Sequence, residues 1–222
     1  MSCLEQVRAD PHGKVMFPNK AYRRKVNAMA NKRSIFRSAL AGTALFPSLV
    51  SAAKPAKRGP RAAYFPNALL RTHDGRQLRF YDDIVSGNKI IVFNMMYTVC
   101  ANICPPNTAT LLRVQELLGE RVGRNIFFYS LTLRPDIDTP DALRAYARLY
   151  GVKPGWTFLT GAHGDMDAIR RKLGFSDRDP VVDADLSQHT GMIRVGNEAY
   201  DRWSMMSARL TPRQLANSIA RL

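Results

Sequence analysis

The chain has 222 residues and is strongly basic, with 33 Lys and Arg residues against 18 Asp and Glu residues and a formal net charge of +15. Residues 1–52 hold about +7 of this charge (nine basic, two acidic) and the rest holds about +8 (24 basic, 16 acidic), scattered along the sequence. Scattered charge argues against a nucleic-acid-binding stripe and favours a solvated basic surface, with an acidic partner protein or an anionic membrane surface as the alternative.

The amino-terminal region predicts export. Residues 1–28 form a polar extension without periodicity, and Met29 would give a leader of ordinary length, so the true start is expected there. Residues 29–52 have the basic, apolar and small-residue regions of a signal peptide. Their apolar run is short and contains Pro47, which fits a cleaved signal better than a membrane span, with an uncleaved signal anchor as the alternative. We expect a protein of the periplasm or of the outer face of the inner membrane.

The remainder is long enough for one domain with a substantial core. Residues 53–66 are rich in Pro and Lys and predict a flexible tether, so the domain is assigned to residues 67–222. At its start, residues 68–80 predict a β-hairpin that turns at Asp74-Gly75.

The central part of the domain alternates strand-like and helical patterns. Apolar runs at 90–93 and 126–131 predict buried strands, and residues 108–118 have a helical pattern between them. Thr139-Pro140 has the form of an N-cap followed by the first helical residue, which predicts a helix through Tyr150.

The last part predicts a short strand, two helices and a hairpin. The strand is expected at 156–159, one helix at 165–173, a hairpin of 192–195 with 198–203 turning at Gly196-Asn197, and a final helix from Thr211-Pro212 to Leu222. This order predicts an α/β, thioredoxin-like fold with a central mixed sheet flanked by helices and an amino-terminal β-hairpin.

Cys100 and Cys104 are the main candidate functional residues, because Cys3 would leave with the leader. They follow the strand predicted at 90–93 and precede a helix, a place where ligand groups gather in α/β sheets and where thiol pKa values are lowered. Two thiols four residues apart can bind one soft metal ion or oxidise to a disulfide. A structural zinc site would need a fourth ligand, and no further Cys is present.

Four segments, in order, resemble the SCO/SenC family of copper-handling proteins. Residues 96–105, Met-Tyr-Thr-Val-Cys-Ala-Asn-Ile-Cys-Pro, are similar to the family's two-cysteine signature. Residues 136–140 resemble its Asp-Thr-Pro region and residues 155–161 its Trp-x-x-Leu-Thr-Gly strand. Gln188-His189-Thr190 falls where the family has the histidine of its Asp-His-Ser/Thr motif. Ala101 and Gln188 depart from the family's usual proline and acid.

The resemblance implies a copper protein that helps to assemble the Cu(A) site of cytochrome c oxidase. Carried over by position, the ligands of Cu(I) or Cu(II) are Cys100, Cys104 and His189. The implied partners are a copper-receiving oxidase subunit or another copper chaperone, and a nucleic acid is not expected.

Two other functions use the same cysteines. A thiol–disulfide oxidoreductase would use Cys100 and Cys104 as its redox pair, although such enzymes normally have Cys-x-x-Cys. A peroxiredoxin-like activity would use Cys100 but explains neither Cys104 nor His189. We therefore favour a non-enzymatic copper chaperone, with oxidoreductase activity as the alternative.

Other sulfur, acid and histidine side chains receive structural assignments. The thioethers of Met95, Met96, Met205 and Met206 could bind Cu(I) but are expected in the core. Met95 and Met96 are neighbours on a strand, so at most one can face the metal. Asp138 is assigned to the turn before Thr139, and no functional role is assigned to His73 or His163.

Overall fold

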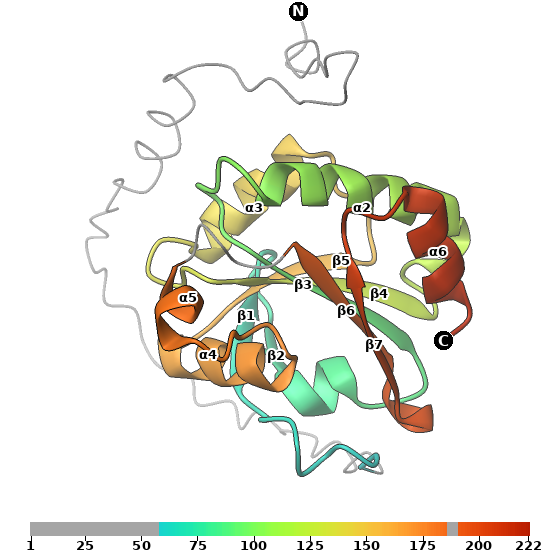
Figure 1. Ribbon diagram of the computed structural model, residues 1–222, viewed down its shortest axis with the longest axis horizontal. Coiled ribbons are helices and arrows are strands. Elements are labelled where there is room, and N and C mark those ends of the chain that lie inside the picture. Colours follow the sequence, from blue (N-terminus) through green and yellow to red (C-terminus); the bar gives the residue numbers. More distant parts are fainter. Residues whose placement is uncertain (1–57, 186–190) are drawn as a thin grey trace, which may run out of the picture.

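The computed structural model describes residues 58–185 and 191–222, so the predicted leader and His189 lie outside the described residues. A seven-stranded sheet with the order β2-β1-β5-β4-β3-β6-β7 forms its centre (Figure 1). The β3–β4 and β4–β5 pairs are parallel and the other pairs are antiparallel. The sheet is therefore mixed, as predicted.

The strands are β1 (Leu69–Thr72), β2 (Gln77–Arg79), β3 (Ile90–Met96), β4 (Ile126–Thr132), β5 (Trp156–Thr160), β6 (Met192–Asn197) and β7 (Arg202–Ser207). The α-helices are α2 (Cys104–Leu118), α3 (Pro140–Leu149), α4 (His163–Lys172), α5 (Pro180–Ala184) and α6 (Pro212–Ala220). Shorter helical turns are the π-helix η2 (Phe80–Val85) and the 3-10 helices η3 (Gly119–Arg121) and η5 (Glu198–Tyr200).

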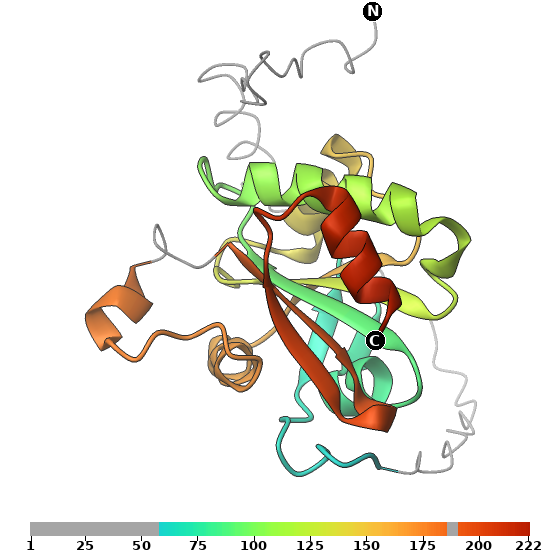
Figure 2. The ribbon, with the colours of Figure 1, turned by 45° about the vertical axis from the view of Figure 1, so that its right-hand side comes forward.

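Helices cover both faces of the sheet, which is why every residue of β3 is buried. Helices α2, α3 and α6 pack on one face, where Val92 and Met96 of β3 point, while α4 and η2 pack on the other face against Ile91, Phe93 and Met95 (Figures 1 and 2). The alternation follows from the two-residue period of a strand. The architecture is an α/β, thioredoxin-like fold.

Several local predictions are confirmed. The first hairpin pairs Leu70 with Leu78 and turns where Gly75 has a φ of 91°, a conformation that glycine adopts without strain. Thr139 caps α3 by accepting a hydrogen bond from the Ala142 N–H at 3.2 Å. Thr211 and Gln214 form a capping box at the start of α6.

The predicted two-residue turn at Gly196-Asn197 is wrong. Strand β6 continues through both residues, and the chain reverses in η5 and at Asp201, whose φ is 49°. Gly196 instead allows a close approach, because a Cβ atom there would lie 2.1 Å from the Trp203 ring. Gly196, which in the sequence is typical of a turn, therefore allows β6 and β7 to pack closely.

Helix α2 begins earlier than the pattern at 108–118 indicates. It starts at Cys104, and prolines 105 and 106 occupy its first turn, where their missing N–H groups cost no helical hydrogen bond. Helix α5 and the π-helix η2 were not predicted, because both are short and have no clear apolar period.

Residues 58–66, part of the predicted tether, contact the domain. Phe65 is buried and packs against the rings of Phe80 and Trp203. The Arg61 N–H donates to the buried Glu198 carboxylate at 2.7 Å. Within the described part of the chain, no helix has the length and apolar character needed to cross a membrane.

Candidate dithiol metal centre

The two cysteines lie at the carboxyl end of the central strand β3. Cys104 is the first residue of α2, and Cys100 lies in the preceding turn, which we call the cysteine loop (residues 97–103). The Cys100 N–H donates to the Tyr97 carbonyl at 3.1 Å, and the Cys104 N–H donates to Cys100 Sγ at 3.3 Å. The pair is therefore brought together by a turn at the helix start, and not by one helical face.

Both thiols are shielded from solvent, with Cys100 8% and Cys104 1% exposed. They belong to the buried cluster that also contains Met96 and Leu111. Cys100 is thus the slightly more exposed of the two cysteines.

The environment separates the acidities of the two thiols. A hydrogen bond from the Cys104 side chain, supported by the N–H groups of residues 102–104, lowers the pKa of Cys100 to about 4 against the opposing effect of burial. The same hydrogen bond, together with burial, raises the pKa of Cys104. The environment therefore favours the thiolate form of Cys100 and the protonated form of Cys104.

Tyr97 completes this polar contact. Burial, followed by a hydrogen bond to the Cys100 side chain, raises the pKa of the Tyr97 hydroxyl to about 12. The phenol therefore stays protonated and acts as a hydrogen-bond donor beside the thiolate.

Asp138 holds the cysteine loop in place from a distance of 40 residues in the chain. Its fully buried carboxylate accepts hydrogen bonds from the Thr98 N–H at 3.2 Å, from Thr98 Oγ1 at 2.5 Å and from Thr132 Oγ1. It therefore ties the cysteine loop to the end of β4. Burial raises the pKa of Asp138, opposed by these hydrogen bonds. The turn role predicted for Asp138 is only part of its role; the sequence contained no signal for a contact with Thr98.

Met95 and Met96 are buried in the core, as expected, whereas Met205 and Met206 are half-buried at its margin. Met96 lies in the same buried cluster as the cysteines, and Met95 lies in the cluster on the opposite face of the sheet. Met206 packs on the cysteine side and Met205 on the opposite side. Strand alternation thus leaves Met96 alone of the first pair on the cysteine side.

The structure does not place the predicted histidine ligand, because His189 lies outside the described residues. Gly191, two residues later in the sequence, lies beside the cysteine helix: a Cβ atom there would be 3.5 Å from the Asn107 side chain and 3.7 Å from that of Ile103. Among residues 58–185 and 191–222, no three His, Cys, Asp or Glu side chains are grouped to hold a metal ion.

The other described histidines have structural surroundings. The Phe158 N–H donates to His73 Nδ1 at 3.2 Å, and the His73 ring packs edge-on against the Phe158 ring. Burial lowers the pKa of His73, so its ring is held as a neutral acceptor. His163 begins α4, a helix that packs on the sheet face opposite the cysteines.

A thioredoxin-like sheet with a buried dithiol at the carboxyl end of its central strand defines a dithiol protein of the thioredoxin-like class. Within that class, the model of the SCO1/SenC family matches residues 69–222. The chain belongs to the SCO1/SenC family.

Solved structures have the same fold. A SCO1/SenC family lipoprotein from Bacillus anthracis is similar with a TM-score of 0.57 at 20% identity, over 71% of this chain and 94% of that one. Bradyrhizobium japonicum ScoI with copper bound has a TM-score of 0.56 at 19% identity, over 69% and 96%. BsSco, a cytochrome c oxidase assembly protein described with a disulfide switch, has a TM-score of 0.57 at 18% identity, over 76% and 95%. A comparison with curated proteins found no match.

Proposed function

We propose that this protein is a copper chaperone that binds one copper ion through Cys100, Cys104 and His189 and passes it to a respiratory cytochrome c oxidase. The observation that carries the proposal is the pair of buried thiols, with the Cys104 N–H in hydrogen-bond contact with Cys100 Sγ at the end of β3, in a chain of the SCO1/SenC family.

The donor set fits copper. Thiolate sulfur suits soft Cu(I), and an imidazole nitrogen helps to hold Cu(II). A metal ligand must be deprotonated, and the lowered pKa of Cys100 favours this form. Binding of the ion by Cys104 requires the loss of the Cys104 proton. Three protein ligands leave one side of the ion open, so that a receiving protein can add its own ligand before the ion leaves.

Two further observations support the proposal. ScoI from Bradyrhizobium japonicum, with the same fold, is solved with copper bound. Gly191 lies beside Ile103 and Asn107. His189 precedes Gly191 by two residues in the sequence.

The setting that we propose is outside the cytoplasm. A similar SCO1/SenC protein is a lipoprotein, and residues 29–52 have the pattern of a signal peptide or signal anchor. The recipient is then a copper-receiving oxidase subunit, or another copper chaperone, on the outer face of the inner membrane.

A second function, thiol–disulfide exchange, is favoured by the unequal acidities of the two cysteines. The Cys100 thiolate would attack a partner disulfide and form a mixed disulfide. The Cys104 thiol would then lose its proton and attack Cys100 Sγ, which releases the partner as a dithiol and leaves a Cys100–Cys104 disulfide. One partner disulfide is reduced for each dithiol that is oxidised.

Copper titration of the reduced protein tests the proposal. We expect one ion per chain, bound at least tenfold more weakly in Cys100→Ser and in His189→Ala and unchanged in the control His73→Ala. Full affinity in His189→Ala would contradict the three-ligand site. Partner disulfide reduction that is unchanged in His189→Ala, combined with weak copper binding by the parent protein, would favour the second function.

A further inference from the structure

The end of the sheet opposite the cysteine loop, which we call the base, is bordered by basic residues. The parallel strands β3, β4 and β5 begin there, β6 ends there, and β7 begins there because it runs antiparallel to β6. Each of the strands β3, β4, β5 and β7 has a Lys or Arg within three residues of its start. In the order of the sheet, these residues are Lys153, Arg124, Lys89 and Arg202, which we call the basic row. Neighbouring strands lie about 4.8 Å apart, so the row extends over about 19 Å from β5 to β7.

Nearby acidic side chains do not neutralise the basic row. Glu198 is fully buried, and Asp201 pairs with Arg61 at 2.5 Å. Glu120 of η3 and Asp83 of η2 are exposed acids in the same region. The members of the row at β4, β5 and β7 are exposed, and within residues 58–185 and 191–222 no carboxylate lies at ion-pair distance from them. The base therefore presents unpaired positive charge to the solvent.

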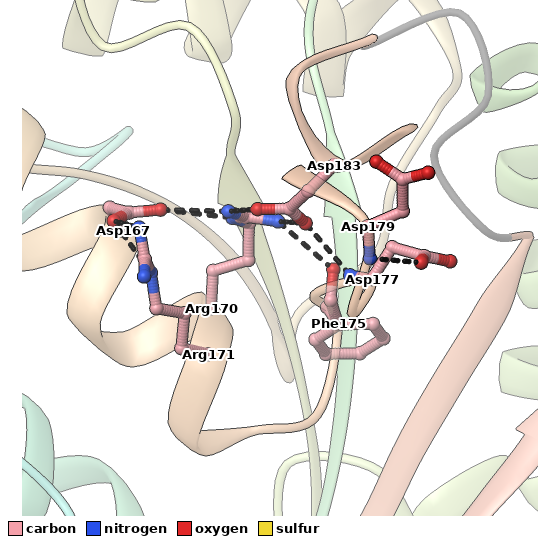
Figure 3. A network of polar contacts seen from close by, with 7 residues as sticks. All are labelled: Asp167, Arg170, Arg171, Phe175, Asp177, Asp179 and Asp183. Carbon is pink, nitrogen blue, oxygen red and sulfur yellow. Dashed lines mark hydrogen bonds and ion pairs between the residues drawn. The ribbon is translucent and has the colours of Figure 1, made fainter. Parts of the chain in front are cut away.

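The ends of β3 and β4 at the cysteine side have a different charge pattern. The cysteine loop contains no charged residue. Arg134, just after β4, pairs with Asp136 at 2.9 Å, and Arg170 of α4 pairs with Asp183 of α5 at 2.5 Å (Figure 3). Both arginines line a cleft beside the end of β3. The middle of the sheet thus has paired charges at its cysteine end and unpaired cations at its base.

An exposed aromatic ring lies beside the basic row. Tyr200 of η5 is 60% exposed, and its hydroxyl accepts a hydrogen bond from the Asn88 side chain at 3.4 Å. The Arg202 guanidinium lies 5.8 Å from the centre of the Tyr200 ring. Tyrosine has an apolar body and a polar tip, and such side chains are enriched where proteins meet the headgroup region of a membrane. The base therefore combines cations with an aromatic residue suited to a lipid surface.

The first described residues of the chain also lie at the base (Figure 2). The Gly59 N–H donates to the Tyr81 hydroxyl at 2.7 Å, and that hydroxyl donates to the Glu198 carboxylate at 3.0 Å. In the sequence, residues 1–57 precede this point, and residues 29–52 have the pattern of a signal peptide or signal anchor. The part of the sequence with membrane-like character thus leads directly to the base, which favours a lipid surface over an acidic protein as its partner.

We propose that the base of the domain docks on the anionic headgroups of a membrane surface through the basic row and Tyr200. Lipid phosphate groups accept hydrogen bonds from guanidinium and ammonium groups, and each Lys or Arg close to an anionic membrane strengthens binding. Docking involves no metal, so it is independent of copper binding. It orients the domain with the cysteine loop on the side away from the lipid.

Hydroxyl-radical footprinting of the full-length protein tests this docking. Vesicles of phosphatidylcholine alone are compared with vesicles that also contain phosphatidylglycerol, and oxidation of Tyr200 is measured by mass spectrometry. Val181 is the internal reference, because it is 78% exposed on α5, which lines the cleft at the opposite end of the sheet. We expect oxidation of Tyr200 to fall severalfold on the anionic vesicles only, with Val181 unchanged on both.

Charge variants show whether the basic row causes the protection. Arg124→Gln/Arg202→Gln removes two exposed charges of the row and should abolish most of the protection of Tyr200, because each charge changes binding to an anionic membrane about fivefold. Added salt should act in the same direction, since it screens exposed charges. The matched control, Arg209→Gln/Arg213→Gln, removes two exposed charges that follow β7 at the cysteine end and should leave the protection unchanged.

Three results would overturn the proposal. If oxidation of Tyr200 is the same on both kinds of vesicle, lipid charge does not bring the base to the membrane. If the control variant loses as much protection as Arg124→Gln/Arg202→Gln, the net charge of the protein acts and not the basic row. If soluble polyglutamate protects Tyr200 and the vesicles do not, the basic row binds an acidic protein instead.

Discussion

The cysteine loop and the α5 segment lie at the same edge of the sheet but are held there by different forces. The loop is anchored in the core, where Asp138 binds Thr98 and Thr132 without contact with water. No residue of helix α5 is fully buried, and the helix is held by the ion pair of Arg170 with Asp183. The position of the cysteine loop is therefore fixed by buried hydrogen bonds, whereas that of α5 is fixed mainly by one ion pair.

The largest effect is expected on the cysteine loop. Asp138→Ala leaves two buried hydroxyl groups and one N–H without their acceptor, and should lower the free energy of unfolding by about 3 kcal/mol. Chemical denaturation measures this. The control is Asp136→Ala, an exposed acid that pairs with Arg134 and whose loss should cost less than about 1 kcal/mol. Equal effects in the two variants would contradict the anchoring role.

A second effect concerns the acidity of Cys100. Its thiolate should react half-maximally with iodoacetamide near pH 4 and lose reactivity below that pH, because protonation removes the nucleophile. Cys104→Ala removes the main hydrogen-bond donor and should move the midpoint to higher pH. Cys104→Ser keeps an O–H donor and should move it less.

Mass spectrometry of the alkylated Cys100 peptide gives both pH profiles. If both variants have the same midpoint as the parent protein, Cys104 does not donate a hydrogen bond to Cys100, and the two thiols do not differ in acidity for this reason.

A smaller global effect is expected on α5. Arg170→Met should lower the free energy of unfolding by no more than about 1 kcal/mol, because α5 can move outward and hydrate the Asp183 carboxylate. Hydrogen exchange should accelerate at the Asp183 N–H, which bonds to the Asp179 carbonyl at 2.8 Å. A loss of about 3 kcal/mol or more would mean that the ion pair supports the core, and the contrast with the cysteine loop would fail.

The smallest effect is expected at Val181. Because its side chain is mostly exposed, Val181→Ser should change the free energy of unfolding by less than about 0.5 kcal/mol. Thermal unfolding of the parent protein and of Val181→Ser, measured under the same conditions, tests this prediction. A clear loss would show that the valine packs against the protein in solution.

Local signals in the sequence predicted the fold well. Gly75, Thr139 and Thr211 act on their immediate neighbours, and the turn at Gly75 and the helix starts at Thr139 and Thr211 are present as predicted. The alternation of side chains along β3 likewise predicted that Met95 and Met96 lie on opposite faces of the sheet, as they do. In each of these cases the residues that interact lie within a few positions of one another.

Contacts between distant residues were not predictable in this way. The pair Gly196-Asn197 is typical of a turn. The strand continues through it because the pairing of β6 with β7 places the Trp203 ring against Gly196, where a side chain would not fit. The bond between Asp138 and Thr98 spans 40 residues. Arg170 lies on a charged helix face, which is a common pattern. Its ion pair with Asp183 forms only because the chain brings Asp183 back to α4, 13 residues later. For the site, the sequence indicated the cysteines but not the groups that position them.

The contact of Arg61 with Glu198 has a consequence for how the domain is presented. Because β6 runs antiparallel to β3, Glu198 lies just beyond the end of the sheet that is opposite the cysteines (Figure 2). The seven residues of β3 span about 23 Å between these ends. Residues 58–66 thus meet the domain near the end of the sheet opposite the thiols and leave the cysteine end uncovered by this segment.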